Sequence, residues 1–257
     1  LVILDACRWD VLNDVTEWPF GKACSPGSQT AQWLGVAEET GIFEGTHIVS
    51  GQGQYERRSL GEASIDKIWE DEYDQRLQTV LPTPVLERAE ERLYAGDTPT
   101  VMHLIPPHAP YIAKVGDKWL LTEPSVNIWK RPNDGDADGT FMSPQVAMAR
   151  GHVDIPRARE GYRASVKSTW EVVEEYVGRW VGDGHTVVVT ADHGEALGRL
   201  REFGLYPHPS GCHIQPLTEV PFEVFKPGEN PHSTPETTEE KLAALGYFDM
   251  VNNDEGD

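Results

Sequence analysis

Short runs of apolar and β-branched residues recur along the chain and predict the strands of a buried sheet. The clearest run is Thr-Val-Val-Val-Thr-Ala at 186–191, directly before an Asp-His pair. Runs that are apolar on both faces are typical of parallel strands covered by helices. The other predicted strands are 1–4, 46–50, 100–105 and 219–225. Pro221 inside the last of these predicts an edge strand or a strand start.

Helical periodicity appears between these strands. From Tyr162 to Val181 the apolar residues step by 4, 3, 4 and 3, and 84–94 has an apolar stripe as well. A third helix is predicted from Ser28, as its N-cap, to about Glu39. Strands that alternate with helices predict an α/β fold, a three-layer sandwich with a mostly parallel central sheet.

Three segments fit this pattern poorly. Residues 55–80 are charged and irregular, which favours a solvated excursion. Residues 113–160, rich in Gly, Asp and Pro, are interpreted as a surface insertion near the site. Residues 227–257 are interpreted as an acidic tail with a short helix near 241–245, so that 1–226 forms one α/β domain.

Polar residues stand at the ends of two predicted strands. Asp192 and His193 follow the strand 186–191, and Asp5 follows the strand 1–4. Open α/β sheets place ligands at the carboxyl ends of their strands. The carboxylate oxygens of the two aspartates and the imidazole nitrogen of His193 are atoms that bind a divalent metal ion. Gly194 is expected to let the backbone turn away from the cleft. Asp192 as a helix N-cap and Asp5 as a turn residue fit the same pattern.

Thr30 falls in the first turn of the helix predicted after Ser28. Backbone N–H groups and the positive end of the helix dipole favour an anion at that place. A hydroxyl there could therefore be activated by a metal beside a phosphate or sulfate group. A purely capping role for Ser28 and Thr30 is the alternative.

Four histidines are further candidates. His108 lies in a proline-stiffened loop after the strand 100–105, near the same sheet edge. His208 and His213 lie in a Gly-Pro loop after the Asp-His strand, and either could reach a metal or a substrate oxyanion. His103 lies within a strand and fits a core residue equally well.

The chain is strongly acidic. Its 42 Asp and Glu residues against 22 Lys and Arg give a formal net charge of −20. This negative charge argues against nucleic acid as a partner, because the protein would repel the phosphates. It also argues against docking on an anionic membrane. Only eight of the basic residues are lysine, and an acidic, lysine-poor surface suggests a halophilic source.

Targeting signals are not evident in the sequence. No apolar stretch approaches the roughly 18 residues of a membrane span, and no secretory signal is seen. A cytoplasmic location is therefore favoured, although the chain begins inside an apolar run without a methionine. Three cysteines without metal-finger spacing do not suggest a disulfide framework.

The order of these features resembles the sulfatase-like branch of the alkaline phosphatase superfamily, and especially short sulfatase-like proteins of haloarchaea. The resemblance rests on the segment 4–10 (Leu-Asp-Ala-Cys-Arg-Trp-Asp), the hydroxyl at a helix start, the Pro-His-x-Pro loop, and Thr-Ala-Asp-His-Gly-Glu-x-Leu-Gly followed by His-Pro and Val-Pro. It spans nearly the whole chain.

The resemblance implies a metal-dependent hydrolase or transferase that acts on phosphate or sulfate esters. Asp5, Asp192 and His193 would hold a divalent ion, with zinc or manganese favoured and calcium or magnesium possible. Thr30 would be the fourth ligand and the nucleophile that forms a covalent ester. His108 and His208 would contact the substrate, a small-molecule or a glycan- or lipid-linked ester, or a second metal.

The chain departs from the sulfatase pattern at more than one position, since Asp5 is followed by Ala6 where sulfatases have a second aspartate. Sulfatases carry a Cys-x-Pro-x-Arg segment whose cysteine becomes formylglycine, but the segment that starts at Cys24 has Ser28 in place of the arginine. This favours Thr30 over Cys24 as the nucleophile, and Arg8 is a further candidate site residue. A non-catalytic protein that binds an anion or glycan is the alternative function, and the oligomeric state is open.

The charge pattern generates a first prediction. We expect the folded protein to lose stability when salt falls well below roughly molar concentration, because screening then no longer reduces self-repulsion. Thermal unfolding in low and high potassium chloride measures this effect. An unfolding temperature that is indifferent to salt would contradict the halophilic hypothesis.

Overall fold

A seven-stranded sheet forms the centre of the molecule. A computed structural model of the chain describes residues 1–96, 98–122, 154–199, 202, 204 and 208–228. The strand order is β2-β11-β10-β1-β7-β3-β4. In chain order these strands are β1 (Val2–Leu4), β2 (Gly21–Cys24), β3 (His47–Ser50), β4 (Ser64–Lys67), β7 (Thr100–Leu104), β10 (Val187–Ala191) and β11 (Glu219–Phe225).

Most of this sheet is parallel, as the apolar runs predict. The strands β10, β1, β7, β3 and β4 pair in parallel. On the other side of β10, β11 pairs antiparallel, and β2 pairs antiparallel with β11. The expectation that 219–225 forms an edge strand is therefore wrong: the proline of β11 lies opposite Lys22 of β2, which covers that edge.

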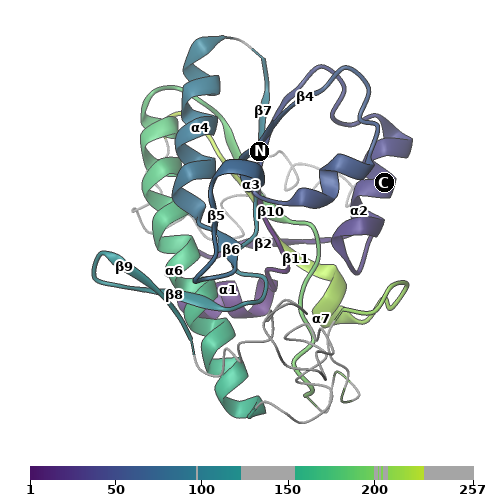
Figure 1. Cartoon of the computed structure of the whole chain (residues 1–257), viewed down its shortest axis with the longest axis vertical. Coiled ribbons are helices and arrows are strands. Elements are labelled where there is room, and N and C mark those ends of the chain that lie inside the picture. The colour runs from purple at the N-terminus through teal and green to yellow at the C-terminus, as the bar shows by residue number, and fades with distance from the viewer. Residues whose placement is uncertain (97, 123–153, 200–201, 203, 205–207, 229–257) are drawn as a thin grey trace, which may run out of the picture.

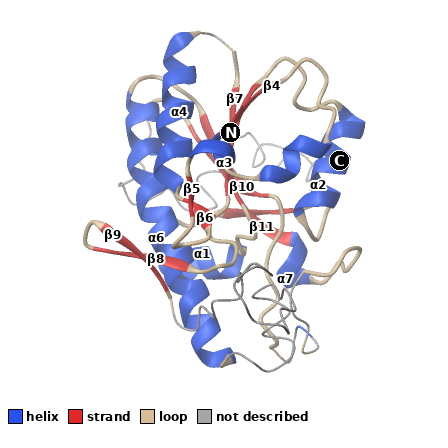
Figure 2. Ribbon diagram, in the orientation of Figure 1, coloured by secondary structure: helices blue, strands red, loops and turns tan. Residues whose placement is uncertain are grey.

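Helices cover both faces of the sheet (Figures 1 and 2). Side chains alternate between the faces along β1: Val2 and Leu4 pack in one core cluster, and Ile3 packs in the other. The larger cluster lies under α1, α4 and α6, and the smaller one under α2 and η1. The helices are α1 (Trp9–Val15), α2 (Thr30–Thr40), η1 (Gly53–Arg57), α3 (Ile68–Asp71), α4 (Pro82–Ala95), α6 (Ile155–Gly182) and α7 (Gln215–Thr218).

Two helix starts differ from the prediction. Helix α2 has Gln29 rather than Ser28 as its N-cap, and Ser28 Oγ instead donates to Pro209 O over 2.8 Å. Helix α6 begins at Ile155, seven residues before the apolar periodicity becomes clear at Tyr162, because the Asp154 side chain caps it by accepting from Arg157 N. Part of the insertion predicted over 113–160 is thus helix.

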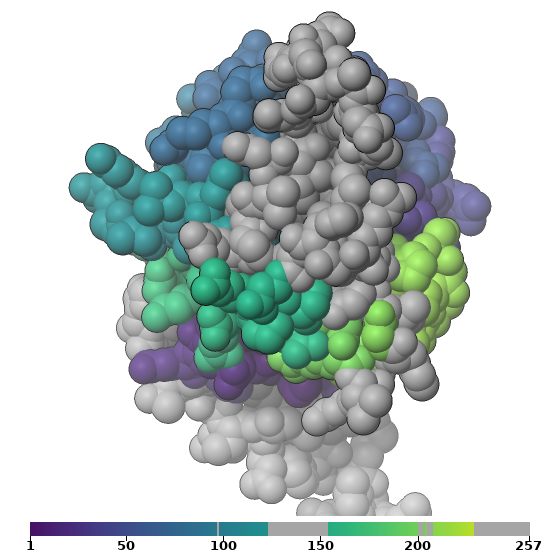
Figure 3. All heavy atoms as spheres, turned by 60° about the horizontal axis from the view of Figure 1, so that its bottom comes forward, coloured from purple at the N-terminus to yellow at the C-terminus, as the bar shows by residue number. Residues whose placement is uncertain are grey.

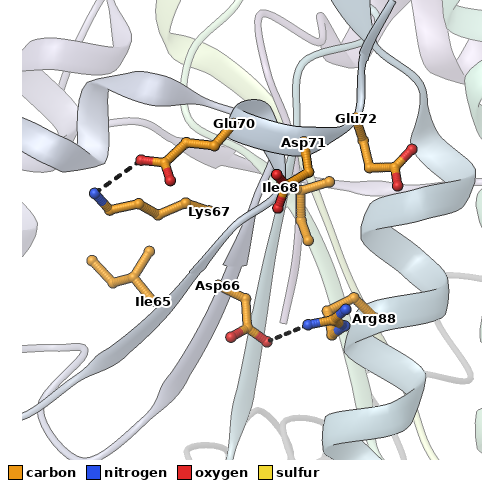
Figure 4. Close-up of a pocket in the computed structure, with 8 residues that line it drawn as sticks. All are labelled: Ile65, Asp66, Lys67, Ile68, Glu70, Asp71, Glu72 and Arg88. Atoms are coloured by element: carbon orange, nitrogen blue, oxygen red, sulfur yellow. Dashed lines mark hydrogen bonds and ion pairs between the residues drawn. The ribbon is translucent and has the colours of Figure 1, made fainter.

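The charged segment 55–80 is not a solvated excursion. It contributes the edge strand β4, the helix α3 and a small antiparallel pair formed by β5 (Tyr73–Asp74) and β6 (Thr79–Val80). Some of its charges are paired: Asp66 accepts from Arg92 of α4 at 2.7 Å, and Lys67 lies 3.2 Å from Glu70. Figure 4 shows the polar pocket that β4, α3 and α4 form here.

A hairpin, β8 (Ile112–Val115) with β9 (Lys118–Leu121), opens the predicted insertion. Its strand β8 packs on α6, where the backbone N–H of Lys114 donates to Ser168 Oγ over 3.0 Å, and the hairpin projects from the side of the molecule (Figure 3). The rest of the insertion up to residue 153, and the tail after residue 228 with its predicted short helix, lie outside the described residues. Among the helices that are described, none combines the length and apolar character of a membrane span.

Gly194 follows β10 and is required for a different reason from the one the sequence suggested. Its backbone does not adopt a positive φ, but a Cβ atom there would lie 2.0 Å from the carbonyl oxygen of Pro216 in α7. Its N–H donates to Leu217 O over 2.8 Å. The glycine therefore allows α7 to pack directly against the loop that carries His193.

We expect Gly194→Ala to lower the free energy of unfolding by about 1–3 kcal/mol, because the added methyl group meets backbone that cannot rotate away. Gly182→Ala, where no atom lies within 4 Å of the added carbon, is the matched control and should change stability by about 0.5 kcal/mol or less. Chemical denaturation of both variants measures the difference. Equal stability of the two variants would contradict the close approach.

Candidate metal centre

Sheet register brings Asp5 and Asp192 to the same place. Leu4 of β1 pairs with Ala191 of β10, so the residue after each strand lies at the same carboxyl edge. His193 is next in the chain. The side chains of Asp5, Asp192 and His193 are fully buried, and each offers a ligand atom within 4.8 Å of the others. These three residues form a candidate metal-binding group.

Hydrogen bonds determine which atoms face the centre. Asp192 Oδ1 accepts from the backbone N–H groups of Ala6 at 3.1 Å and His193 at 2.9 Å. Asp192 Oδ2 is buried and has no hydrogen-bond partner in the described structure. The ring atom Nδ1 of His193 lies 2.7 Å from Gly194 O, so Nδ1 donates to that oxygen and Nε2 is the nitrogen that can face a metal once its own proton is lost.

Thr30 completes the group from the start of α2. Its Oγ1 lies 3.4 Å from Asp5 Oδ1 and 3.3 Å from His193 Nε2. The same His193 atom lies 3.4 Å from Asp5 Oδ1 and 3.5 Å from Asp192 Oδ2. Four donor atoms from two strand ends and one helix start therefore converge on one point.

This donor set fits a divalent cation. Ligands about 2.0–2.2 Å from a tetrahedral zinc ion stand roughly 3.3–3.6 Å from one another. The measured separations of 3.3 to 3.5 Å match that spacing. Three oxygens with one imidazole nitrogen suit zinc or manganese better than calcium, which prefers six to eight oxygens. The buried Oδ2 atom of Asp192 would also gain the partner that it otherwise lacks.

The charges of this group are strongly coupled. Burial, and then the charge of Asp5, raise the pKa of Asp192. Burial alone would also raise the pKa of Asp5, but the charge of His108 and the hydrogen bond from His193 lower it below its usual range. Burial alone would lower the pKa of His193, but Asp192 and Asp5 raise it to about 9. Without a metal, the His193 proton therefore supplies positive charge to two adjacent carboxylates.

A pair of histidines lies beside the donors. His108 Nε2 and His208 Nε2 are 3.2 Å apart, and the ring centroids of His208 and His193 are separated by 4.5 Å. His108 Nδ1 lies 2.6 Å from Ala109 O, so in the neutral form of His108 the Nε2 atom has a free lone pair and can accept a hydrogen bond from His208 Nε2–H. Burial and the charges of His193 and His108 lower the pKa of His208 to about 3. The structure thus brings both predicted substrate-contact residues to the centre.

The remaining candidates have different surroundings. His103 is buried in β7, with its Nε2 3.7 Å from Asp192 Oδ2. Arg8 is buried in ion pairs with Asp10 and Glu202, and it donates to Glu195 O over 3.0 Å, which holds the chain that follows His193. Cys24 is exposed at the end of β2, and His213 is exposed before α7. None of these four belongs to the group of donor atoms.

Two residues around the centre were missed at the sequence level. Gln52 Nε2 donates to Asp5 Oδ2 over 2.6 Å, and the Ser25 hydroxyl donates to the backbone oxygen of Asp192. Gln52 stands just beyond the strand 46–50, so the rule that found Asp5 and Asp192 also applies to it. Ser25 had no such signal, because β2 is largely exposed and has no apolar run.

Comparisons with known proteins bear on the fold. No family model and no curated protein sequence matches the chain. Among solved structures, the soluble domain of lipooligosaccharide phosphoethanolamine transferase A from Neisseria meningitidis matches with a TM-score of 0.55 at 14% identity, over 87% of this chain and 74% of that one. The C-terminal periplasmic domain of EcEptC from Escherichia coli, in complex with Zn, matches with a TM-score of 0.52 at 12% identity, over 94% and 76%.

A 2-O GAG sulfatase also matches, with a TM-score of 0.54 at 12% identity, over 92% of this chain. The chain spans only 65% of that sulfatase. Phosphoethanolamine transferases and sulfatases are members of the alkaline phosphatase superfamily, and identities this low bear on the fold alone. The chain therefore has the alkaline-phosphatase/sulfatase-like fold, which confirms the predicted fold class.

The donor geometry predicts a proton-coupled metal affinity. At pH 7 the metal-free His193 is protonated, because its pKa is about 9, and a ligand must be unprotonated. Zinc binding should therefore release about one proton per ion, and the affinity should rise with pH up to about 9. Titration calorimetry in buffers of different ionisation enthalpy measures this release.

The variant His185→Gln, on the loop before β10, should release the same number of protons as the wild type, whereas His193→Gln should lose binding. Zinc affinity that stays constant between pH 6 and pH 9 would contradict the assignment of His193 as a ligand.

Proposed function

We propose that the protein is a metal-dependent hydrolase or transferase of phosphate esters, with Thr30 as the nucleophile. One observation carries this proposal: a threonine hydroxyl at a helix start lies 3.3 to 3.4 Å from two candidate ligands of a buried metal centre. A residue with a merely capping role would have no reason to direct its oxygen into a cluster of buried charges.

The residues of the chain support the following steps. A bound divalent cation would supply Lewis-acid charge, lowering the pKa of the Thr30 hydroxyl and stabilising negative charge on the substrate. With the hydroxyl proton released to solvent, Thr30 Oγ1 bonds to phosphorus while the bond to the ester oxygen breaks. Water or an acceptor alcohol then attacks phosphorus. The bond between phosphorus and Thr30 Oγ1 breaks, and the Thr30 hydroxyl is restored.

The other groups at the centre support these steps. The first turn of α2 presents backbone N–H groups and the positive end of the helix dipole to the phosphoryl oxygens. His208 Nε2 lies 3.2 Å from His108 Nε2, and with substrate between the two rings a neutral His208 could donate a hydrogen bond from Nε2–H to the departing oxygen, which would take its proton from water. This gives both histidines a contact with the substrate.

Phosphate is favoured over sulfate by the position of Cys24. That cysteine, which would have to become formylglycine in a sulfatase, is exposed on β2 and contributes no atom to the donor group. Thr30 occupies the place where the nucleophile is needed. Sulfate esters are the second candidate substrate, because sulfate and phosphate esters are tetrahedral oxyanions of similar size. No feature of the structure specifically favours the non-catalytic alternative.

We further propose zinc as the metal and a glycan- or lipid-linked ester as the substrate. Support comes from the matched structures, which include a Zn complex, a lipooligosaccharide phosphoethanolamine transferase and a GAG sulfatase. One of them is a periplasmic domain. This favours a location outside the cytoplasm over the cytoplasmic location that the sequence alone suggested.

We expect Thr30→Ala to lower turnover of nitrophenyl phosphate or bis-nitrophenyl phosphate by roughly 10³-fold or more, because the covalent step is lost. Thr30→Ser, which keeps the hydroxyl, should retain part of the activity. Mass spectrometry of protein quenched during turnover should find a phosphate ester on the peptide that contains Thr30.

Two control variants accompany this experiment. Thr40→Ala, at the exposed far end of the same helix, should leave turnover unchanged. Cys24→Ser should also remain active. If Cys24→Ser loses activity while Thr30→Ala keeps it, the sulfatase mechanism is correct and the Thr30 proposal is wrong.

A further inference from the structure

We propose that the segment around η1 is the outer shell of the metal centre, in which Gln52 positions Asp5 directly and Tyr55 positions Asp192 through His103. The inference rests on the proposed metal centre and assigns roles to residues outside its ligand group. It concerns the strength of metal binding rather than the chemical step.

The Gln52 amide has a defined direction. Its Oε1 accepts from the backbone N–H of Gln54 at 3.4 Å, as the N-cap of η1. A backbone N–H can only donate, so the amide nitrogen must point the other way, where it donates to Asp5 Oδ2 over 2.6 Å. The Ser50 hydroxyl fixes the Gln52 backbone by accepting from its N–H at 2.9 Å.

This contact selects the oxygen that Asp5 offers to a cation. With Oδ2 held by Gln52, Oδ1 faces Thr30 at 3.4 Å and His193 at 3.4 Å. A neutral donor on the outer oxygen holds the carboxylate in one orientation without adding charge. Gln52 therefore prepares Asp5 for a single-oxygen contact with the metal.

The carboxylate of Asp192 also has a neighbouring side chain outside the ligand group, the imidazole of His103. Asp192 Oδ2 and His103 Nε2 are 3.7 Å apart, both are buried, and neither has a hydrogen-bond partner in the described structure. On the far side of the ring, His103 Nδ1 lies 3.0 Å from the Tyr55 hydroxyl. Tyr55 is 1% exposed and is therefore fixed in place.

Electrostatics decide the tautomer of His103. If Tyr55 donates to Nδ1, the ring proton is on Nε2 and points toward the Asp192 carboxylate, which is attractive. In the other tautomer a nitrogen lone pair would face that carboxylate, which is repulsive. The first arrangement is favoured, so the Tyr55 hydroxyl sets the tautomer that orients Asp192.

The test measures zinc dissociation constants by chelator competition without substrate. Gln52→Ala should weaken zinc binding by about 10- to 100-fold, the usual effect of removing an outer-shell partner. Tyr55→Phe, which keeps the ring and its packing, should weaken binding in the same direction. The matched controls are Gln54→Ala, which removes an exposed side chain of η1 but keeps the backbone N–H that Gln52 accepts from, and Tyr176→Phe in α6; both should bind zinc as the wild type does.

A second measurement is independent of metal. Nitrogen-15 spectra of the histidine side chains in the metal-free protein should show His103 as the Nε2-protonated tautomer, and Tyr55→Phe should lose that fixed state. A purely structural role for Tyr55 predicts unchanged spectra. Thermal unfolding of each metal-free variant identifies any general loss of folding.

The outcomes separate this inference from the proposed function. If the wild type binds zinc and both variants bind it equally well, the outer shell is refuted while the proposed function stands. If the wild type binds zinc but turns over no ester, the function fails, and the affinities of the variants still decide the inference. A wild type that binds neither zinc nor manganese refutes both.

Discussion

The burial of two carboxylates beside one imidazole is the constraint on which this structure depends. Asp5, Asp192 and His193 have no exposed surface, and unpaired charges in such a place cost several kcal/mol each. Backbone N–H groups satisfy one oxygen of Asp192, and the Gln52 amide satisfies one oxygen of Asp5. Asp5 Oδ1, Asp192 Oδ2 and His193 Nε2 then face one another. This arrangement is favourable only when a positive charge, from a proton or a metal ion, lies between them.

The architecture can be understood as the means of holding these atoms. Parallel pairing of β1 with β10 places the two carboxylates side by side, and the end strand β2 leads into α2, whose first residue is Thr30. Arg8, itself buried between Asp10 and Glu202, ties the end of β1 to the chain after His193. The position of each donor therefore depends on contacts between segments that are far apart in the sequence.

The sequence predicted the parts of this arrangement that follow local rules. Asp5 and Asp192 were identifiable because each directly follows an apolar strand, and Thr30 because a helix begins near it. The order of the strands is a long-range property, and nothing near Leu4 indicates that Ala191 is its partner. The outer contacts were missed for physical reasons: the irregular charge pattern of 55–80 gave no sign of the strand and helices that form there, and the exposed β2 has no apolar pattern.

The central position of β1 has a consequence for how the protein is made. Val2 lies between Met102 of β7 and Val189 of β10, so this strand has neither lateral partner while the early part of the chain leaves the ribosome. Contacts this distant in sequence slow folding, because a long loop must close before they form. The strand β1 therefore gains its two neighbours only after the much later segments β7 and β10 have been made, so the order of synthesis is part of the folding problem of this sheet.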